Sequence, residues 1–160
     1  MKFLIAFICS LALLFNNEID WFRNNFQSAK NFKAEASAFY LKSESITSSD
    51  PIILGYKAAG KMLQSKFEKN KQLKKDLFKE GATTLNDLIE DNPKNIELRF
   101  IRLAVQQNTP AILKYNGNIN DDKQFILSNY KSAHVKQQLM IKDYVLSSNK
   151  FTDSEKKSLQ

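Results

Sequence analysis

The sequence predicts an all-α fold, a bundle of five to seven helices arranged as antiparallel hairpins. Apolar side chains recur at helical spacing through most of the chain, and no long stretch alternates apolar and polar residues as a strand would. Only four glycines and three prolines occur among the 160 residues, which is few for a protein built of strands and tight turns. The length is that of one domain with a core of its own.

The first seventeen residues differ in character from the rest of the chain. Lys2 precedes an apolar run over residues 3–15 in which only Ser10 is polar. As a helix this run would be about 20 Å long, shorter than the roughly 30 Å core of a bilayer. A basic start followed by a short apolar run is typical of a secretory signal peptide, although an uncleaved anchor or a buried helix are alternatives. We expect residues 1–17 to be the signal peptide and residues 18–160 to form a single helical domain.

Removal of a signal peptide would have consequences for the mature protein. It would be exported to the periplasmic or extracellular side of the envelope, with no stable transmembrane segment. The only cysteine, Cys9, would be lost with the signal peptide. This would exclude disulfides, thiolate metal sites and a cysteine nucleophile.

The first half of the domain contains clear helix boundaries. An apolar face runs from Ile19 to Tyr40 and ends at the serine-rich residues 46–50. Asp50 followed by Pro51 predicts a helix start, because an acid can cap the helix and proline fits its first turn. A break is predicted at residues 69–71, before a helix that reaches Ile89.

We expect the helix that follows Asn95 to be the axis of the fold. Pro93 interrupts the chain before it, and Asn95 can cap its first turn. Its apolar positions cover more than half of its circumference, as in a helix packed against several neighbours. Phe100 and Leu103 are therefore expected at the centre of the core.

The remaining elements are shorter. Residues 110–115 are predicted to form a helical turn and 116–118 a loop. A helix then begins near Asp121 and Asp122, and another is expected over 132–147. Thr152 and Glu155 have the spacing of a capping box at the start of a terminal helix.

Two resemblances support this organisation. Residues 81–100, GATTLNDLIEDNPKNIELRF, resemble the second helix of a tetratricopeptide repeat, its turn and the next first helix, with Gly81 at a position for a small residue and Pro93 as the turn proline. The segments NPKNIELRFIRLAVQQNTPAILKYNGNINDD and KFTDSEKKSL are similar to those of small exported helical proteins of Bacteroidota. These resemblances imply a loosely tetratricopeptide-like helical fold and export, and they imply no activity.

The chain has none of the common catalytic or nucleotide-binding motifs. It lacks a P-loop, a G-x-G-x-x-G turn, an H-E-x-x-H pair and a G-x-S-x-G elbow. His134 is the only histidine, and we interpret it as a surface or helix-cap residue. Asp121 and Asp122 could be half of a metal or acid–base pair, but helix capping explains them more simply. We predict no cofactor and no metal.

One candidate polar site lies around the start of the central helix. Glu97 projects among apolar residues, which is unfavourable for a carboxylate unless it is paired or solvated. It could line a small polar site with Arg99, Arg102, Tyr115 and Asn116. The alternative is a structural ion pair beside a packed tyrosine.

The polar stripe of the central helix gives a further expectation. Arg99, Arg102 and Gln106 lie on one narrow side of it. If this stripe faces water, truncating Arg102 to alanine should cost under about 1 kcal/mol.

The second candidate site is a basic patch. Residues 57–79 contain eight lysines against Glu68 and Asp76, a net charge of +6. The lysines that we assign to the patch are Lys57, Lys61, Lys66, Lys71, Lys74, Lys75 and Lys79. They could bind an acidic lipid surface, a polysaccharide or an acidic protein, or simply form a solvated face. Nucleic acid is disfavoured because arginines and aromatic residues are not interleaved with the lysines.

Two hypotheses for function follow. The first is a non-enzymatic protein-binding or scaffold module that contacts another envelope protein or an acidic surface through its helical faces. The second is an enzyme of unusual type that uses Glu97, Arg99 and Arg102 in a polar pocket. We favour the first, and the sequence leaves the oligomeric state open.

Overall fold

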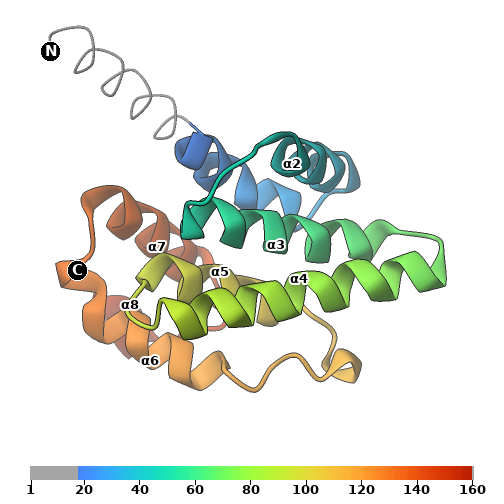
Figure 1. Ribbon diagram of the computed structural model, residues 1–160. Helices are drawn as coiled ribbons and strands as arrows, with labels where there is room; N and C mark the ends of the chain where they lie inside the picture. Colours follow the sequence, from blue (N-terminus) through green and yellow to red (C-terminus); the bar gives the residue numbers. More distant parts are fainter. Residues whose placement is uncertain (1–17, 160) are drawn as a thin grey trace, which may run out of the picture.

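The structure, a computed structural model, describes residues 18–159 and is entirely helical over that range (Figure 1). The all-α prediction is confirmed. The described residues form eight α-helices, one more than the expected maximum, because a turn at residues 30–32 divides the first apolar face into two helices. The expected signal peptide, residues 1–17, lies outside the described residues.

The helices are joined by short connections. An N-terminal helix occupies residues 18–29. It is followed by α2 (Lys33–Ser45), α3 (Pro51–Phe67), α4 (Lys71–Asp91), α5 (Ile96–Gln106), α6 (Ile119–Asn129), α7 (Val135–Ser147) and α8 (Asp153–Lys157). Two short 3-10 helices, η1 (Ala111–Leu113) and η2 (Tyr130–Ser132), flank α6.

The helix starts predicted at Asp50, Asn95 and Thr152 are confirmed, whereas α6 begins before Asp121, at Ile119, and α7 begins at Val135 instead of residue 132. The side chain of Asp50 accepts hydrogen bonds from two backbone amides in the first turn of α3, and Asn95 does the same for α5. Thr152 and Glu155 form the reciprocal hydrogen bonds of a capping box at α8. These side chains satisfy amide donors that have no partner within the helix.

α3 and α4 lie side by side and pack closely (Figure 1). Gly81 of α4 permits this approach, because a Cβ atom there would lie 2.4 Å from the carbonyl oxygen of Ala58 in α3. Any larger residue would force the two helices apart. Gly81 therefore sets the spacing of the α3–α4 pair.

α5 is the buried centre of the molecule, as predicted. It packs against α3, α4 and α6, and Phe100 and Leu103 are both almost fully buried. The Phe100 ring has its centroid 6.3 Å from that of Phe26 and 5.2 Å from that of Tyr144. It therefore joins the N-terminal helix to α7.

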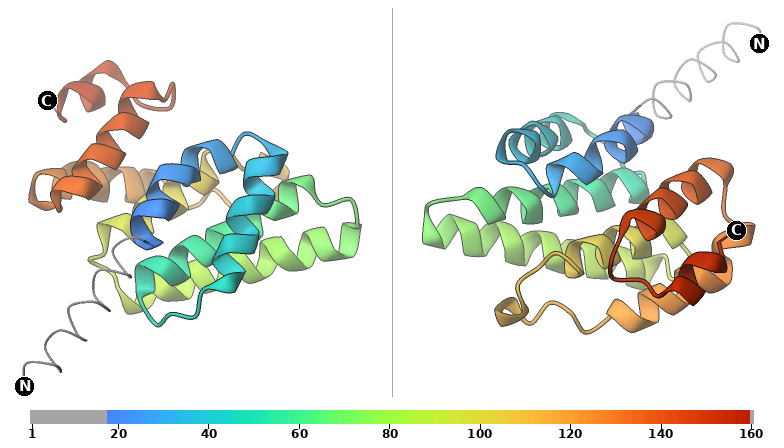
Figure 2. Two further views of the ribbon diagram at one scale, coloured as in Figure 1. Left: turned by 90° about the horizontal axis from the view of Figure 1, so that it is seen from above. Right: turned by 180° about the vertical axis from the view of Figure 1, so that it is seen from behind.

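The elements around α5 form two groups (Figure 2). The N-terminal helix and α2 cover one side of α3. The second group consists of α6, α7 and α8, and α6 packs along α5. The hydrophobic core extends continuously from Ile19 to Leu159 within the described chain. Among those residues, no helix has the length and apolar character needed to cross a membrane.

Candidate functional site

Glu97 is fully buried at the start of α5 and is the centre of a hydrogen-bonded network. Its Oε1 accepts from Arg23 Nε and from the hydroxyl of Tyr56, both at 2.8 Å. Its Oε2 accepts from Arg23 Nη2 at 2.6 Å and from Gln137 Nε2 at 3.0 Å. One carboxylate thus connects the N-terminal helix, α3, α5 and α7.

The pKa shifts of Arg23 and Tyr56 agree with their role as hydrogen-bond donors to Glu97. Burial alone would lower the pKa of Arg23, but the hydrogen bonds and the charge of Glu97 raise it overall. Burial, together with the negative charge of Glu97, raises the pKa of Tyr56 well above its usual value. Both groups therefore keep their protons, and both oxygens of Glu97 are already occupied. Such a carboxylate stabilises the fold and has no free position for acid–base work.

A second ion-pair network lies on another side of α5. The guanidinium of Arg102 donates from Nε to Asp122 Oδ2 at 2.7 Å and from Nη2 to Oδ1 at 2.8 Å. Arg99 donates to the same Oδ1 at 3.1 Å, and its guanidinium lies 4.3 Å from the ring centre of Phe125. Asp122 is fully buried.

The expectation that Arg102 faces water is therefore wrong. Only 6% of Arg102 is exposed, and Gln106 of the same stripe is also buried. α6 covers this side of α5 and supplies Asp122, whose carboxylate compensates the buried guanidinium. A helix can thus present a polar stripe to a neighbouring helix instead of to solvent.

The residues of the polar site predicted from the sequence do not form one site in the structure. Arg99 and Arg102 meet at Asp122, whereas Glu97 belongs to the separate network with Arg23. Tyr115 packs its ring against Phe78 of α4, with centroids 5.6 Å apart.

Tyr115 lies near the second network, because the charges of Asp122 and Arg102 act on its hydroxyl. Burial and the nearby charge of Asp122 raise the pKa of Tyr115 to about 12, despite the opposing effect of Arg102. Its buried hydroxyl has no hydrogen-bond partner among the described residues. Asn116 is exposed to solvent.

Sequence reasoning did not predict the pairings that complete both networks. It interpreted Asp122 as a capping acid, but Asp122 lies in the first turn of α6 and pairs with Arg102, and no side chain caps that helix. Arg23 and Asp122 lie 74 and 20 residues from their partners on α5, so local spacing gives no direct sign of either pairing. The sequence did contain one indication that Asp122 faces the core. It precedes the buried Ile126 by one helical turn, so both lie on the same face of α6.

His134 has the role expected of a helix cap. It is exposed and stands at the N-cap of α7, where its ring nitrogen Nδ1 accepts from the backbone amide of Lys136. The side-chain oxygen Oε1 of Gln137 accepts a hydrogen bond from the backbone amide of His134, which completes a capping box.

Two shallow hollows mark the surface. One, of about 500 Å³, lies between the N-terminal helix and α7. It is lined by Asp20, Arg23, Asn24, Gln27, Lys136, Leu139, Met140 and Asp143. The amide nitrogen of Gln27 is buried there without a partner among the described residues. This hollow adjoins the Glu97 network through Arg23.

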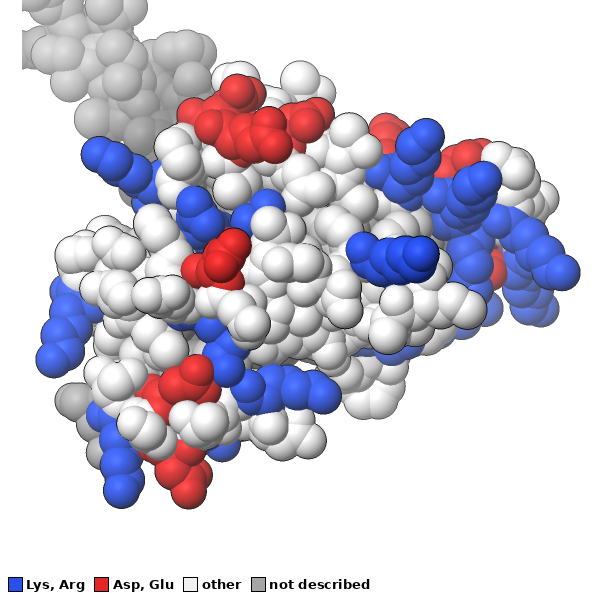
Figure 3. Space-filling view, turned by 90° about the horizontal axis from the view of Figure 1, so that it is seen from below, with Lys and Arg blue, Asp and Glu red and all other residues white. Residues whose placement is uncertain are grey.

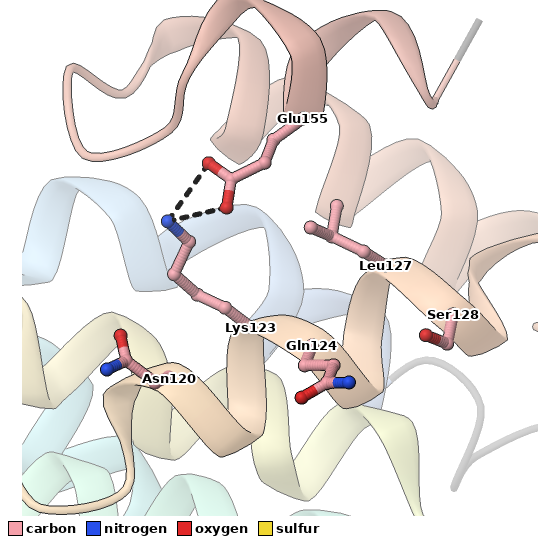
Figure 4. A pocket seen from close by; sticks show the side chains of 6 residues that line it. All are labelled: Asn120, Lys123, Gln124, Leu127, Ser128 and Glu155. Carbon is pink, nitrogen blue, oxygen red and sulfur yellow. Dashed lines mark hydrogen bonds and ion pairs between the residues drawn. The ribbon is translucent and has the colours of Figure 1, made fainter.

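The other hollow, of about 410 Å³, lies between α6 and α8 (Figure 4). Lys123 of α6 points at the carboxylate of Glu155 of α8, with its Nζ 2.9 Å from one oxygen and 3.0 Å from the other. Burial raises the pKa of Glu155, but the hydrogen bond and charge of Lys123, together with hydrogen bonds from Thr152, lower it overall. The two charges neutralise each other and attach α8 to α6.

Lys30 is a buried cation of a different kind. Only 5% of the residue is exposed, and its ammonium group lies 4.3 Å from the ring centre of Tyr144 and 5.7 Å from that of Phe26. No carboxylate of the described residues forms an ion pair with it. Burial lowers the pKa of Lys30 to about 8. The aromatic faces favour its charge, but less than water would.

This burial predicts a pH dependence of stability. Below pH 8, Lys30 is charged in both states and its burial disfavours the folded state. Between pH 8 and 10.5 the folded state loses the proton first, so the unfolded state binds more protons and stability rises with pH. We expect a gain of about 2–3 kcal/mol across this window, relative to Lys30→Met.

Urea unfolding of both proteins at several pH values measures this difference. Tyr144 remains neutral in the window, because burial raises its pKa to about 12. Parallel pH profiles for the wild type and Lys30→Met would contradict the assignment.

The lysines of the predicted basic patch fall into two sets. Three of them contact neighbouring groups. Lys57 donates to the carbonyl oxygen of Ile46 at 3.0 Å, Lys66 donates to that of Lys30 at 3.0 Å, and Lys61 pairs with Glu80.

The other four, together with Lys69, project into solvent, and none of the five pairs with a described carboxylate within 4 Å. We call these five residues the lysine face: Lys69, Lys71, Lys74, Lys75 and Lys79. Basic side chains gather at the same end of the α3–α4 pair in Figure 3.

The comparisons with known proteins give no relative. No protein-family model, curated protein or solved structure matches this chain. Within residues 18–159, no group of three or more histidine, cysteine, aspartate or glutamate side chains is placed to hold a metal ion.

Proposed function

We propose that this chain is an exported, non-enzymatic helical module that attaches to an acidic surface of the cell envelope through its lysine face. The observation that carries the proposal is the lysine face itself. Five exposed ammonium groups lie at one end of the molecule, without ion-pair partners in the described chain. A surface with concentrated positive charge attracts acidic partners and speeds their association.

The buried charges support the non-enzymatic part of the proposal. Glu97 and Asp122 are the two fully buried carboxylates of the described chain, and each of their oxygens already accepts at least one hydrogen bond from arginine or another donor. Neither has a free oxygen facing a hollow. Acid–base catalysis needs a group that can exchange its proton with a substrate.

The proposal of export rests on the sequence pattern of residues 2–15. We also propose that α4, the turn at Asn92 and Pro93, and α5 form a tetratricopeptide-like unit in a fold of antiparallel hairpins. The close contact at Gly81 is consistent with such a unit, since that motif needs a small residue at this position.

Charge reversal tests the lysine face. The variant Lys71→Glu/Lys75→Glu removes four units of positive charge from one side of α4. The matched control, Lys131→Glu/Lys157→Glu, removes the same charge from exposed positions on η2 and α8. The probe is a bead coated with polyglutamate, which offers carboxylates and no lipid.

We expect the protein of residues 18–160 to bind these beads at low salt. Binding should weaken steeply with added salt, because the screening length falls from about 10 Å at 0.1 M to about 3 Å at 1 M. The Lys71/Lys75 variant should lose most of its binding and the control should lose little. Equal losses in the two variants would show that net charge alone is responsible and would overturn the proposal.

A further inference from the structure

The 3-10 helix η1 exposes an unusual apolar surface. Pro110, Ala111, Ile112 and Leu113 are consecutive and all four are exposed. Ile112 is 86% exposed and Leu113 is 48% exposed. Single exposed apolar residues are common on proteins, but a contiguous group marks a contact surface.

The backbone holds η1 in a defined shape. The amide of Leu113 donates to the carbonyl oxygen of Pro110, and the amide of Lys114 donates to that of Ala111, both at 3.0 Å. Lys114 has a φ of 52°, the only positive φ at a non-glycine residue in the described chain. This left-handed residue turns the chain sharply, so η1 projects as a tight wedge.

The wedge lies beside the lysine face. Tyr115, two residues after Leu113, packs edge-on against Phe78 of α4. Around the helix axis, Lys71, Lys74 and Lys75 all lie within about 60° of Phe78. These lysines therefore project on the side of α4 where η1 is attached. Figure 1 and the right view of Figure 2 show the turn that contains η1 on the side of α4 that faces away from α3.

We propose that this combined surface docks on an anionic lipid bilayer: Ile112 and Leu113 enter the boundary between headgroups and acyl chains, and the lysine face binds the lipid phosphates. This inference rests on the proposed function and identifies the acidic surface. An apolar wedge flanked by basic residues has the two features that interfacial membrane binding requires, buried apolar area and attraction to anionic lipid.

The shape of the surface favours lipid over an acidic protein. The wedge is exposed and has the lysine face on one side, so a protein partner would need a groove for Ile112 with acidic residues beside it. A bilayer accommodates an exposed apolar group without prior shaping. Exposed lysines near an anionic membrane surface are attracted from within about one screening length.

Vesicle binding of the protein of residues 18–160 tests the wedge. The vesicles contain phosphatidylglycerol and phosphatidylcholine, with pure phosphatidylcholine as the neutral comparison. The variant is Ile112→Asp. The matched control is Leu41→Asp, which changes a 67% exposed leucine on α2. Both positions are exposed, so both variants should fold.

We expect the wild type to bind the anionic vesicles and to bind the neutral ones weakly. Ile112→Asp should lower the partition coefficient by about tenfold or more, as expected for losing one buried isoleucine. Leu41→Asp should leave it unchanged. In an Ile112→Trp variant, brominated lipids should quench the new tryptophan, whereas Trp21 in the wild type should remain unquenched.

The other outcomes separate the two proposals. Equal vesicle binding by wild type and Ile112→Asp would overturn the wedge, even if the polyglutamate result supports the lysine face. Binding to polyglutamate without binding to anionic vesicles would overturn the lipid assignment and indicate an acidic protein or polymer. Failure of charge reversal on the beads would overturn the proposed function itself.

Discussion

Replacing Glu97 with alanine should lower the free energy of unfolding by about 3–5 kcal/mol, because it removes a buried carboxylate that accepts four hydrogen bonds and leaves the half-buried Arg23 with only its ion pair to Asp20. Arg23 would lose both of its hydrogen bonds to Glu97, and the buried hydroxyl of Tyr56 would lose its 2.8 Å contact with this carboxylate. The change also removes the hydrogen bonds through which Glu97 links the N-terminal helix, α3 and α7 to α5. Urea unfolding followed by circular dichroism measures the loss.

Two controls isolate the cause of this effect. Glu90→Ala removes an exposed glutamate from α4 and should change stability by less than about 0.5 kcal/mol. The double variant Arg23→Met/Glu97→Leu removes both charges and should lose less than Glu97→Ala alone, since no charge is left unpaired. A loss under about 1 kcal/mol for Glu97→Ala would mean that the carboxylate is not held in this network.

Truncating Arg102 to alanine should lower the free energy of unfolding by about 3 kcal/mol. The expectation from the sequence was below 1 kcal/mol, for a residue facing water. In the structure, Arg102 provides two short hydrogen bonds to the fully buried Asp122. Without Arg102, this carboxylate keeps only the longer contact to Arg99.

Arg99→Ala is the natural comparison for Arg102→Ala. Arg99 makes one contact to Asp122 and its side chain is more exposed, so its loss should cost about 1 kcal/mol. The ranking of the two variants in urea melts is the decisive observation. Equal, small losses would restore the interpretation of a solvent-facing stripe.

The sequence predicted the helices well because their signals are local. Asp50, Asn95 and Thr152 act within one turn of their own positions, and the capping interactions were found where expected. The central place of α5 also followed from one helix, since apolar residues around most of its circumference require neighbours on most sides. Phe100 could be placed in the core on this ground alone.

The ion pairs could not be predicted in the same way. Periodicity identifies a polar stripe at Arg102 but does not reveal whether solvent or another helix covers it. The partner of Glu97 comes from a helix 74 residues earlier, and only the tertiary fold brings Arg23 to it. The sequence did indicate that Glu97 needed a partner, because it stands among apolar residues.

The lysine face and η1 were also only partly predictable from the sequence. The sequence identified the lysine-rich segment 57–79, but it did not show that Lys57, Lys61 and Lys66 contact neighbouring groups while the lysines of α4 project into solvent. It did not indicate that Ile112 and Leu113 would be exposed, since an apolar turn after a buried helix is equally compatible with the core. Their position beside the lysines follows from the contact between Tyr115 and Phe78.

Retention on native envelope material tests the central claim most directly. The protein of residues 18–160 is added to envelope membranes from the source cell, and the bound fraction is measured for the wild type, Lys71→Glu/Lys75→Glu and Ile112→Asp. We expect the wild type to be retained at low salt and both variants to be released into the supernatant. Retention of both variants at the wild-type level would contradict attachment through the lysine face and η1.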